Sequence, residues 1–341
     1  MTLLPEWAPQ DAIQLAWPHS HSDWAPWLPD ATQLYVTLCR MISQYQQLLI
    51  AVDPTVDLAT VKAQCEAVGC IMDNIHWQLI PTNDTWARDH GPITVSRQGE
   101  LQCLDFQFNG WGNKFSWQKD NNISRQIAQA NMFAAPLVQQ DLVLEGGSIE
   151  WDGQGTLMTT KKCLLNPNRN PTLSAEQIEN ALIEAFNAEQ ILWLTHGDLL
   201  GDDTDAHIDT LARFCSPNHI AYVKCFDETD VHFPELQAME AELTKARNFQ
   251  GQAYQLVPLP LPPARFNQEN DRLPLTYANF LITNQQVIVP IYGCETDQQA
   301  LDQLVPVFPD RKVVGLDCSV LVEQFGSLHC ITMQLPKGVL A

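Results

Sequence analysis

The chain has 341 residues, of which 45% are hydrophobic and 17% are charged, and this composition is typical of a globular protein with a large core. The formal net charge of −21 argues against nucleic acid as a partner, because phosphate binding requires clustered Lys and Arg. No signal-peptide pattern opens the chain and no apolar run is long enough to span a bilayer. We therefore expect a cytoplasmic protein with no membrane partner, whose acidity either favours a small cationic ligand or serves only solubility.

The middle of the chain contains a unit in which the pattern is strand, tight turn, strand, capped helix and strand. Alternating and apolar runs mark the strands, and a Ser-x-x-Gln capping box marks the start of the helix. The strands are expected at 147–151, 156–160 and 191–194, the turn at 152–153, and the helix after the box at Ser174–Gln177.

The same order of elements recurs twice towards the C-terminus. Strands are expected at 207–214, 220–223, 279–282, 287–292 and 313–316, with helices after Pro234 and after Thr296. The units begin near His19, Asp89, Glu145, His207, Tyr277 and Cys330, at intervals of roughly 60 residues. This period predicts five units whose last strand completes the first, in a closed ring that removes sheet edges. An ordinary α/β alternation without ring symmetry remains the alternative. No linker-like stretch divides the chain, so we expect one domain over 1–341.

Four polar segments stand at the starts of these units, where a ring would bring them together on its axis. The segments are 86–92, 145–148, 202–209 and 326–330. A ring would therefore place Asp89, Glu145, His207, Asp209 and Cys330 in one cavity. On extended strands His207 and Asp209 would share a face, whereas His329 would point away from Cys330. This alternation predicts a structural role for His329 and makes His207 the partner of Cys330.

Ten cysteines are spread along the chain without any C-x-x-C pair, which argues against a zinc ribbon or a thioredoxin-like motif. We expect buried thiols in a reducing compartment. The alternating run of Asp203, Asp205, His207 and Asp209 leaves a metallohydrolase open as an alternative, because carboxylates and imidazole can bind divalent cations. A non-enzymatic binding protein on the same ring is a further alternative.

Together these segments make the chain resemble the agmatine deiminase family, which belongs to the guanidino-group-modifying (pentein) superfamily with peptidylarginine deiminases. The resemblance covers nearly the whole chain and rests on the motifs at 16–19, 86–92, 108–112, 144–149, 207–209 and 329–332. It implies an α/β fold, a five-bladed propeller around a central active site. Two departures lie beside the expected pocket: Ala206 stands where glycine is common, and 325–328 replaces a glycine-rich run.

The resemblance also implies the role of each site residue. Asp89 and Asp209 would hold the planar guanidinium in forked pairs, and Cys330 would attack it as a thiolate. His207 would act as acid and then base, oriented by a hydrogen bond to Glu145. From the residue types alone, and not from the resemblance, we expect Asp203 to face the cationic tail and Trp86 and Trp111 to line the methylene stem, with a loop cap and core aromatics as the alternatives. No metal or organic cofactor is expected.

Agmatine is the favoured substrate, because the motifs are rich in Asp and Trp whereas free arginine would require a basic partner for its carboxylate. The reaction would yield N-carbamoylputrescine and ammonia on the route to putrescine, through a covalent amidino-cysteine. Deiminases of peptidyl or free arginine and, less favoured, an amidinotransferase are the alternatives. The nearby basic candidates are Arg88, Arg213 and Arg265, the expected lid is 244–275, and a homo-oligomer is possible.

Overall fold

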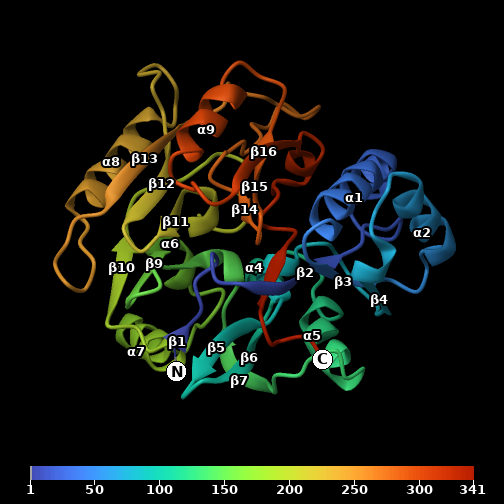
Figure 1. Ribbon diagram of the computed structural model, residues 1–341. Helices are drawn as coiled ribbons and strands as arrows, with labels where there is room; N and C mark the ends of the chain where they lie inside the picture. Colours follow the sequence, from blue (N-terminus) through green and yellow to red (C-terminus); the bar gives the residue numbers. More distant parts are fainter. Residues whose placement is uncertain (1) are drawn as a thin grey trace.

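The structure is a computed structural model that describes residues 2–341. The chain forms five separate sheets arranged in a ring, with the longer helices on the outside (Figure 1). The two four-stranded sheets and three three-stranded sheets match the five units predicted from the repeat, so the five-bladed α/β propeller is confirmed.

The first sheet joins the two ends of the chain. Its strands, in order across the sheet, are β17 (Met333–Pro336), β2 (Gln10–Ala16), β3 (Gln47–Val52) and β4 (Ile75–Leu79). The accompanying helices are η1 (Ala25–Trp27), α1 (Leu28–Ser43), α2 (Leu58–Ala67) and η2 (Met72–Asn74). The antiparallel pairing of β17 with β2 closes the ring, as the last strand was expected to do.

The second and third sheets follow in chain order. The second contains β1 (Thr2–Leu3), β5 (Ile93–Arg97), β6 (Glu100–Gln107) and β7 (Leu137–Val143), with α3 (Ala87–His90), α4 (Gly110–Asn113), η3 (Asp120–Asn122) and α5 (Ile123–Gln129). The third contains β8 (Ile149–Trp151), β9 (Thr156–Thr160) and β10 (Gln190–Leu194), with η4 (Gly146–Ser148), α6 (Lys161–Leu164) and α7 (Ala175–Phe186).

The fourth and fifth sheets repeat the same plan. The fourth contains β11 (Ala212–Ser216), β12 (His219–Lys224) and β13 (Gln255–Pro260), with η5 (Ile208–Thr210) and α8 (Phe233–Lys245). The fifth contains β14 (Leu281–Ile282), β15 (Gln286–Ile291) and β16 (Lys312–Asp317), with α9 (Asp297–Leu304) and η6 (Leu321–Gln324).

Each blade has an antiparallel pair of strands followed by a helical crossover to a parallel strand, and in the first blade this pair joins the two ends of the chain. In the third blade β8 pairs antiparallel with β9, and β10 pairs parallel with β9. The crossover helix α7 begins at the predicted capping box, in which Ser174 and Gln177 exchange side-chain to backbone hydrogen bonds. Its buried residues Ile178, Leu182 and Phe186 recur at helical spacing and pack into the core. This burial holds the helix against its sheet.

The first strand of most blades begins later than the sequence predicts. Residues 208–210 form a 3-10 turn rather than part of a strand from 207, and residues 328–331 form a turn. Polar side chains fold back on the backbone here: Thr210 Oγ1 donates to the carbonyl of His207 at 2.9 Å. The strand alternation expected around His207 and Cys330 is therefore wrong. The chain turns here before the strand starts, so the adjacent side chains of His329 and Cys330 both reach Asp209.

His19, expected to start the first unit, does not occupy an axial position. It follows β2, and burial beside Lys119 and His21 lowers its pKa despite the opposing charge of Asp53. The axial position of this blade belongs to Cys330, which precedes β17. Within residues 2–341, every helix is too short or too polar to cross a lipid bilayer.

Candidate active site

A cavity opens beside the axial segments of the ring. Of the predicted site residues, Cys330, Asp89, Trp86, Trp111 and Asp203 line it. His207, Asp209 and Glu145 are fully buried behind its wall. The remaining lining residues are Asp23, Asp84, Phe115, Asp202, Thr204, Thr210, Gln324, Phe325 and Gly326.

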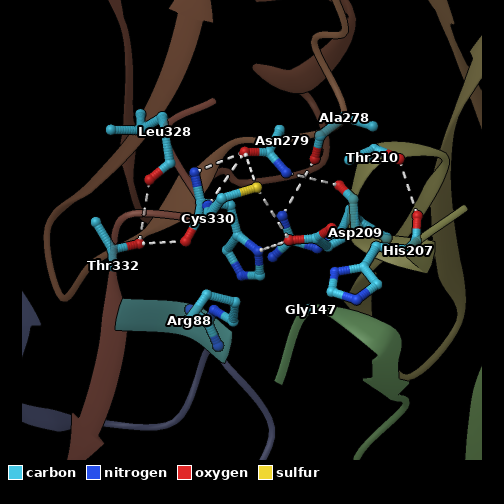
Figure 2. Close-up of polar contacts among 12 residues, drawn as sticks. Arg88, Gly147, His207, Asp209, Thr210, Ala278, Asn279, Leu328, Cys330 and Thr332 are labelled. Carbon is cyan, nitrogen blue, oxygen red and sulfur yellow. Dashed lines mark hydrogen bonds and ion pairs between the residues drawn. The ribbon is translucent and has the colours of Figure 1, made fainter. Parts of the chain in front are cut away.

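Each of the five blades contributes a segment to the cluster of polar groups around Cys330 (Figure 2). In each case the segment lies just before a strand of the antiparallel pair of its blade. The five contributions are Asp89 before β5, Gly147 before β8, His207 and Asp209 before β11, Asn279 before β14, and Cys330 before β17.

Gly147 is the point on which three of the side chains converge. A Cβ atom added at this glycine would lie 2.7 Å from Nδ1 of His207, 2.8 Å from Oδ1 of Asp89 and 3.1 Å from Oδ2 of Asp209. The first two distances are shorter than real Cβ atoms show, so a larger residue here would displace His207 and Asp89. Its N–H donates to Oδ1 of Asp89 at 3.0 Å and fixes that carboxylate.

Cys330 faces two acceptors. Its Sγ lies 3.4 Å from Oδ1 of Asn279 and 3.8 Å from Oδ2 of Asp209, so the thiol proton has two oxygens to which it can be donated. Burial, with the charges of Asp209 and Asp89, raises the pKa of the Cys330 thiol well above its ordinary value. Burial and these two carboxylates therefore favour the neutral thiol, and a cation placed between the two aspartates would oppose their effect on its ionisation.

His207 is buried among groups that favour its protonated form. Burial alone would lower its pKa, but Asp89, Cys163 and Glu145 raise it to about 10. Its Nδ1 lies 3.6 Å from Oδ1 of Asp89, and neither ring nitrogen has a hydrogen-bond partner among the described residues. Burial raises the pKa of Asp89 to about 6, with the charge of His207 opposing that rise. A protonated imidazole beside the binding carboxylate can serve as a general acid.

Glu145 does not make the predicted hydrogen bond to His207. Both of its carboxylate oxygens accept from Nε of Arg169, at 2.9 and 3.0 Å, and both side chains are completely buried. Arg169 also donates to Oδ2 of Asp205 at 2.7 Å. The expectation is wrong because it left out the cation that a buried carboxylate needs. Glu145 instead acts on His207 through its charge.

Arg169 and Asn279 are the two site residues that sequence reasoning missed. Arg169 lies in the loop 166–170, which belongs to no strand start and carries no repeat signal. Asn279 stands two residues after the expected unit start at Tyr277, so the repeat itself was the signal that would have found it. Its Oδ1 accepts from the backbone N–H of His329 at 2.8 Å and of Cys330 at 3.3 Å.

Aromatic side chains form the walls above these groups. Nε1 of Trp111 donates to Oδ2 of Asp89 at 3.0 Å. A Cβ at Gly326 would lie 2.2 Å from the ring of Trp86. The backbone of segment 325–328, which differs from the family pattern, therefore packs directly against that ring. The other departure, Ala206, adopts a φ of 64°, which is the left-handed region that favours glycine.

The mouth of the cavity is acidic. Burial and the neighbouring Asp202 raise the pKa of Asp203, while Lys114 opposes the rise. Asp23 and Asp84 lie in the same lining, and among the residues of 2–341 that line the cavity there is no Lys or Arg.

The three basic candidates are held elsewhere by partners of their own. Arg88 pairs with Glu6, Arg213 pairs with Glu6 and Glu150, and Arg265 donates to the carbonyl of Tyr292. They leave the cavity without a counter-ion for a substrate carboxylate.

The alternating Asp203–Asp209 run does not gather into a metal-binding set. Asp205 is bound to Arg169 and Lys114, whereas Asp209 faces Cys330. In the part of the chain that the structure describes, His, Cys and acidic groups come together only at Glu145, Cys163 and His207 and at Glu6, Glu150 and His329. No residue of the expected lid, 244–275, lines the cavity, whose rim comes instead from 23, 84, 202–204 and 324–326.

Comparisons with known proteins agree on one family. The model of the Porphyromonas-type peptidyl-arginine deiminase family matches residues 2–336. A solved structure from Porphyromonas gingivalis, described as a candidate arginine deiminase, is 45% identical with a TM-score of 0.94 over 99% of both chains. A substrate-bound cysteine-to-serine variant of agmatine deiminase from C. jejuni is 38% identical with a TM-score of 0.91, over 99% of this chain and 96% of that one. A relative from Marinomonas sp. (strain MWYL1), named as a candidate agmatine deiminase, is 34% identical over 97% of this chain and 93% of its own length.

Proposed function

The chain belongs to the Porphyromonas-type peptidyl-arginine deiminase family, and we propose that within it the chain is an agmatine deiminase. It is a guanidino-modifying hydrolase of the agmatine deiminase type, so the resemblance seen in the motifs is confirmed at the level of family. The proposed reaction converts agmatine and water to N-carbamoylputrescine and ammonia, and would supply the route to putrescine.

One observation carries the choice of agmatine. The cavity that ends at Cys330 is lined by five carboxylates and several aromatic rings, and no Lys or Arg among the described residues faces into it. Agmatine carries a guanidinium and a second cation and has no carboxylate. Free arginine would bring a carboxylate into an acidic lining with no cation to receive it, which costs binding free energy.

Binding begins with the guanidinium between Asp89 and Asp209. Oδ2 of Asp209 already accepts from His329, whereas its buried Oδ1 is without a partner in residues 2–341 and is free to accept an N–H of the substrate. Planar guanidinium and carboxylate groups pair in forked geometry, which fixes the orientation of the central carbon. Asp203 at the mouth would face the distal ammonium, and Trp86 and Trp111 would enclose the methylene stem.

The chemistry then follows from Cys330 and His207, the two groups whose pKa values are raised. The bound cation lowers the cost of ionising Cys330, whose proton passes to water, and Sγ forms a bond with the guanidinium carbon. His207 gives its proton to the departing nitrogen, and ammonia leaves as the carbon–nitrogen bond breaks. Neutral His207 next removes a proton from water, which attacks the same carbon. The carbon–sulfur bond breaks, the remaining hydroxyl proton of the adduct passes to the departing thiolate, and a urea-type product leaves.

The site supports one catalytic domain over 1–341, because the groups at its base come from all five blades. The ten cysteines carry no disulfide, and together with the nucleophilic thiol they support a reducing compartment.

Product analysis tests the proposal. We expect purified protein to release ammonia and N-carbamoylputrescine from agmatine with a higher kcat/KM than from free arginine or an arginine peptide. Better turnover of arginine or of the peptide would replace agmatine by that substrate. A requirement for an added amine before any product forms would indicate an amidinotransferase instead.

A further inference from the structure

The N-terminal segment, residues 2–9, brings a carboxylate to the cluster behind the nucleophile. Oε1 of Glu6 accepts from Nε2 of His329 at 2.7 Å and lies 3.1 Å from Nη1 of Arg88. Oε2 accepts from Nε2 of Gln334 at 2.9 Å and from Nη2 of Arg213 at 2.5 Å. None of these groups takes part in the proposed reaction, so the cluster needs another explanation.

His329 stands between this carboxylate and the active site. Its ring is fully buried, with Nδ1 2.7 Å from Oδ2 of Asp209 and Nε2 2.7 Å from Oε1 of Glu6. A neutral imidazole has a single N–H and can donate in only one of these two contacts. Both contacts are hydrogen bonds only if Asp209, His329 and Glu6 share two protons.

The surroundings of Glu6 and Asp209 favour their ionised forms, which assigns both protons to the ring of His329. Burial opposes ionisation of Glu6, but Arg213, His329 and Arg88 hold its pKa well below the ordinary value. Burial likewise opposes ionisation of Asp209, and His329 lowers its pKa. With both acids ionised, the two 2.7 Å contacts are both hydrogen bonds only if His329 carries two protons. Burial, Arg213 and Arg88 lower the pKa of His329, whereas the charge of Glu6 and the hydrogen bond to Asp209 oppose this fall and would hold the second proton on the ring.

This chain of contacts decides which oxygen of Asp209 meets the substrate. Nδ1 of His329 occupies Oδ2, and Oδ1 stays buried without a partner within 2–341. We infer that Glu6 and His329 are positioning residues, which form a carboxylate–imidazolium–carboxylate chain that orients Asp209 towards the guanidinium. The catalytic role of Asp209 in this inference rests on the proposed function, but the hydrogen-bonded row of Glu6, His329 and Asp209 does not.

The protonation of His329 between Glu6 and Asp209 can be measured without substrate. In ¹⁵N-histidine NMR spectra at pH 7, the ring signals lost in His329→Gln identify His329. We expect both of its nitrogens to be protonated in the wild type and one to be unprotonated in Glu6→Gln, in which the carboxylate facing Nε2 is gone. A neutral His329 in the wild type, or an imidazolium unchanged in Glu6→Gln, would overturn the inference. Neither result would bear on the proposed function, which is tested by agmatine turnover.

Kinetics test the positioning role with a matched control. Glu6→Gln should lower kcat/KM for agmatine by roughly 10- to 100-fold, because a misplaced binding group costs that much. It should also move the acid limb of the pH profile upwards and steepen it, since Asp209 loses its cationic neighbour while it remains buried. Glu150→Gln changes another carboxyl of the same cluster, bonded to Arg213 and to the N–H of Phe214, and should leave the acid limb in place.

A merely structural cluster predicts a different result. Both variants would then lower the melting temperature and keep the wild-type pH profile per folded molecule. That outcome, or an equal shift of the acid limb in Glu6→Gln and Glu150→Gln, would contradict the positioning role. If the wild type turned over no agmatine, the proposed function would fail. The NMR result would still show whether His329 is protonated on both nitrogens between Glu6 and Asp209.

Discussion

Oδ2 of Asp209 lies 3.8 Å from the sulfur of Cys330, so the carboxylate that would hold the substrate also opposes ionisation of the nucleophile. This relationship links binding to reactivity. An empty site keeps the thiol protonated and inert, and a cation on Asp209 relieves the repulsion at the moment when attack is required. The thiol should therefore react slowly with neutral alkylating reagents until a guanidinium occupies the site.

Asp203 should govern recognition of the distal ammonium. Asp203→Asn removes a charge from the cavity mouth and should raise KM for agmatine by about 10-fold, equivalent to about 1.4 kcal/mol of lost attraction. Butylguanidine has the same guanidinium and no distal cation, so its KM should stay unchanged. Steady-state kinetics with both substrates check this, and an equal loss with butylguanidine would show that Asp203 does not meet the tail.

The acid limb of kcat/KM should reflect Asp89. Its pKa is raised to about 6, mainly by burial, and only the ionised carboxylate can pair with a guanidinium. Activity should therefore fall as pH drops through about 6, rather than near the ordinary aspartate value. A pH profile checks this, with Asp89→Asn expected to lose most activity at every pH. An acid limb below pH 4 would contradict the assignment.

Gly147→Ala should abolish turnover with a small loss of stability. The added methyl group would meet His207 and Asp89 at less than 3 Å and would push both side chains out of place. Gly315→Ala is a matched control, because the three atoms nearest to its Cβ would be side-chain atoms of Ile291, at 3.0 to 3.4 Å and away from the site. Rate measurements with melting temperatures separate the two effects. Wild-type activity in Gly147→Ala would contradict the convergence at this position.

Arg169→Gln should destabilise the fold by about 3–5 kcal/mol, because it leaves Glu145 buried without its cation. A second change, Glu145→Gln, should recover part of that free energy, since a neutral amide no longer requires a counter-ion. Activity should not return, because His207 would lose a neighbouring charge. Denaturant unfolding of the single and double variants measures the coupling. Strictly additive losses would show that the pair does not interact.

The architecture could be predicted because it repeats. Capped helices such as α7 and the hairpin of β8 and β9 obey local rules, and their recurrence located five blades. The axial polar residues followed from the same recurrence. The starts of the first strands were missed because residues such as 208–210 read as extended by pattern, whereas their polar side chains bind nearby backbone and turn the chain inwards.

The supporting groups could not be predicted because their contacts are remote in sequence. Glu6 meets His329 across 323 positions, and Asn279 meets Cys330 across 51. The position of Arg169 is defined by its contacts with Glu145 and Asp205, which a strand pattern does not specify. Buried charges must be paired, but one sequence shows only that an acid needs a cation and not which cation it has.

Covalent catalysis by Cys330 on a guanidinium can be detected by mass spectrometry of protein quenched during agmatine turnover. We expect the peptide containing Cys330 to gain the mass of agmatine less ammonia, and Cys330→Ala to show neither adduct nor turnover. An adduct on a different cysteine, or undiminished hydrolysis by Cys330→Ala, would rule out Cys330 as the nucleophile.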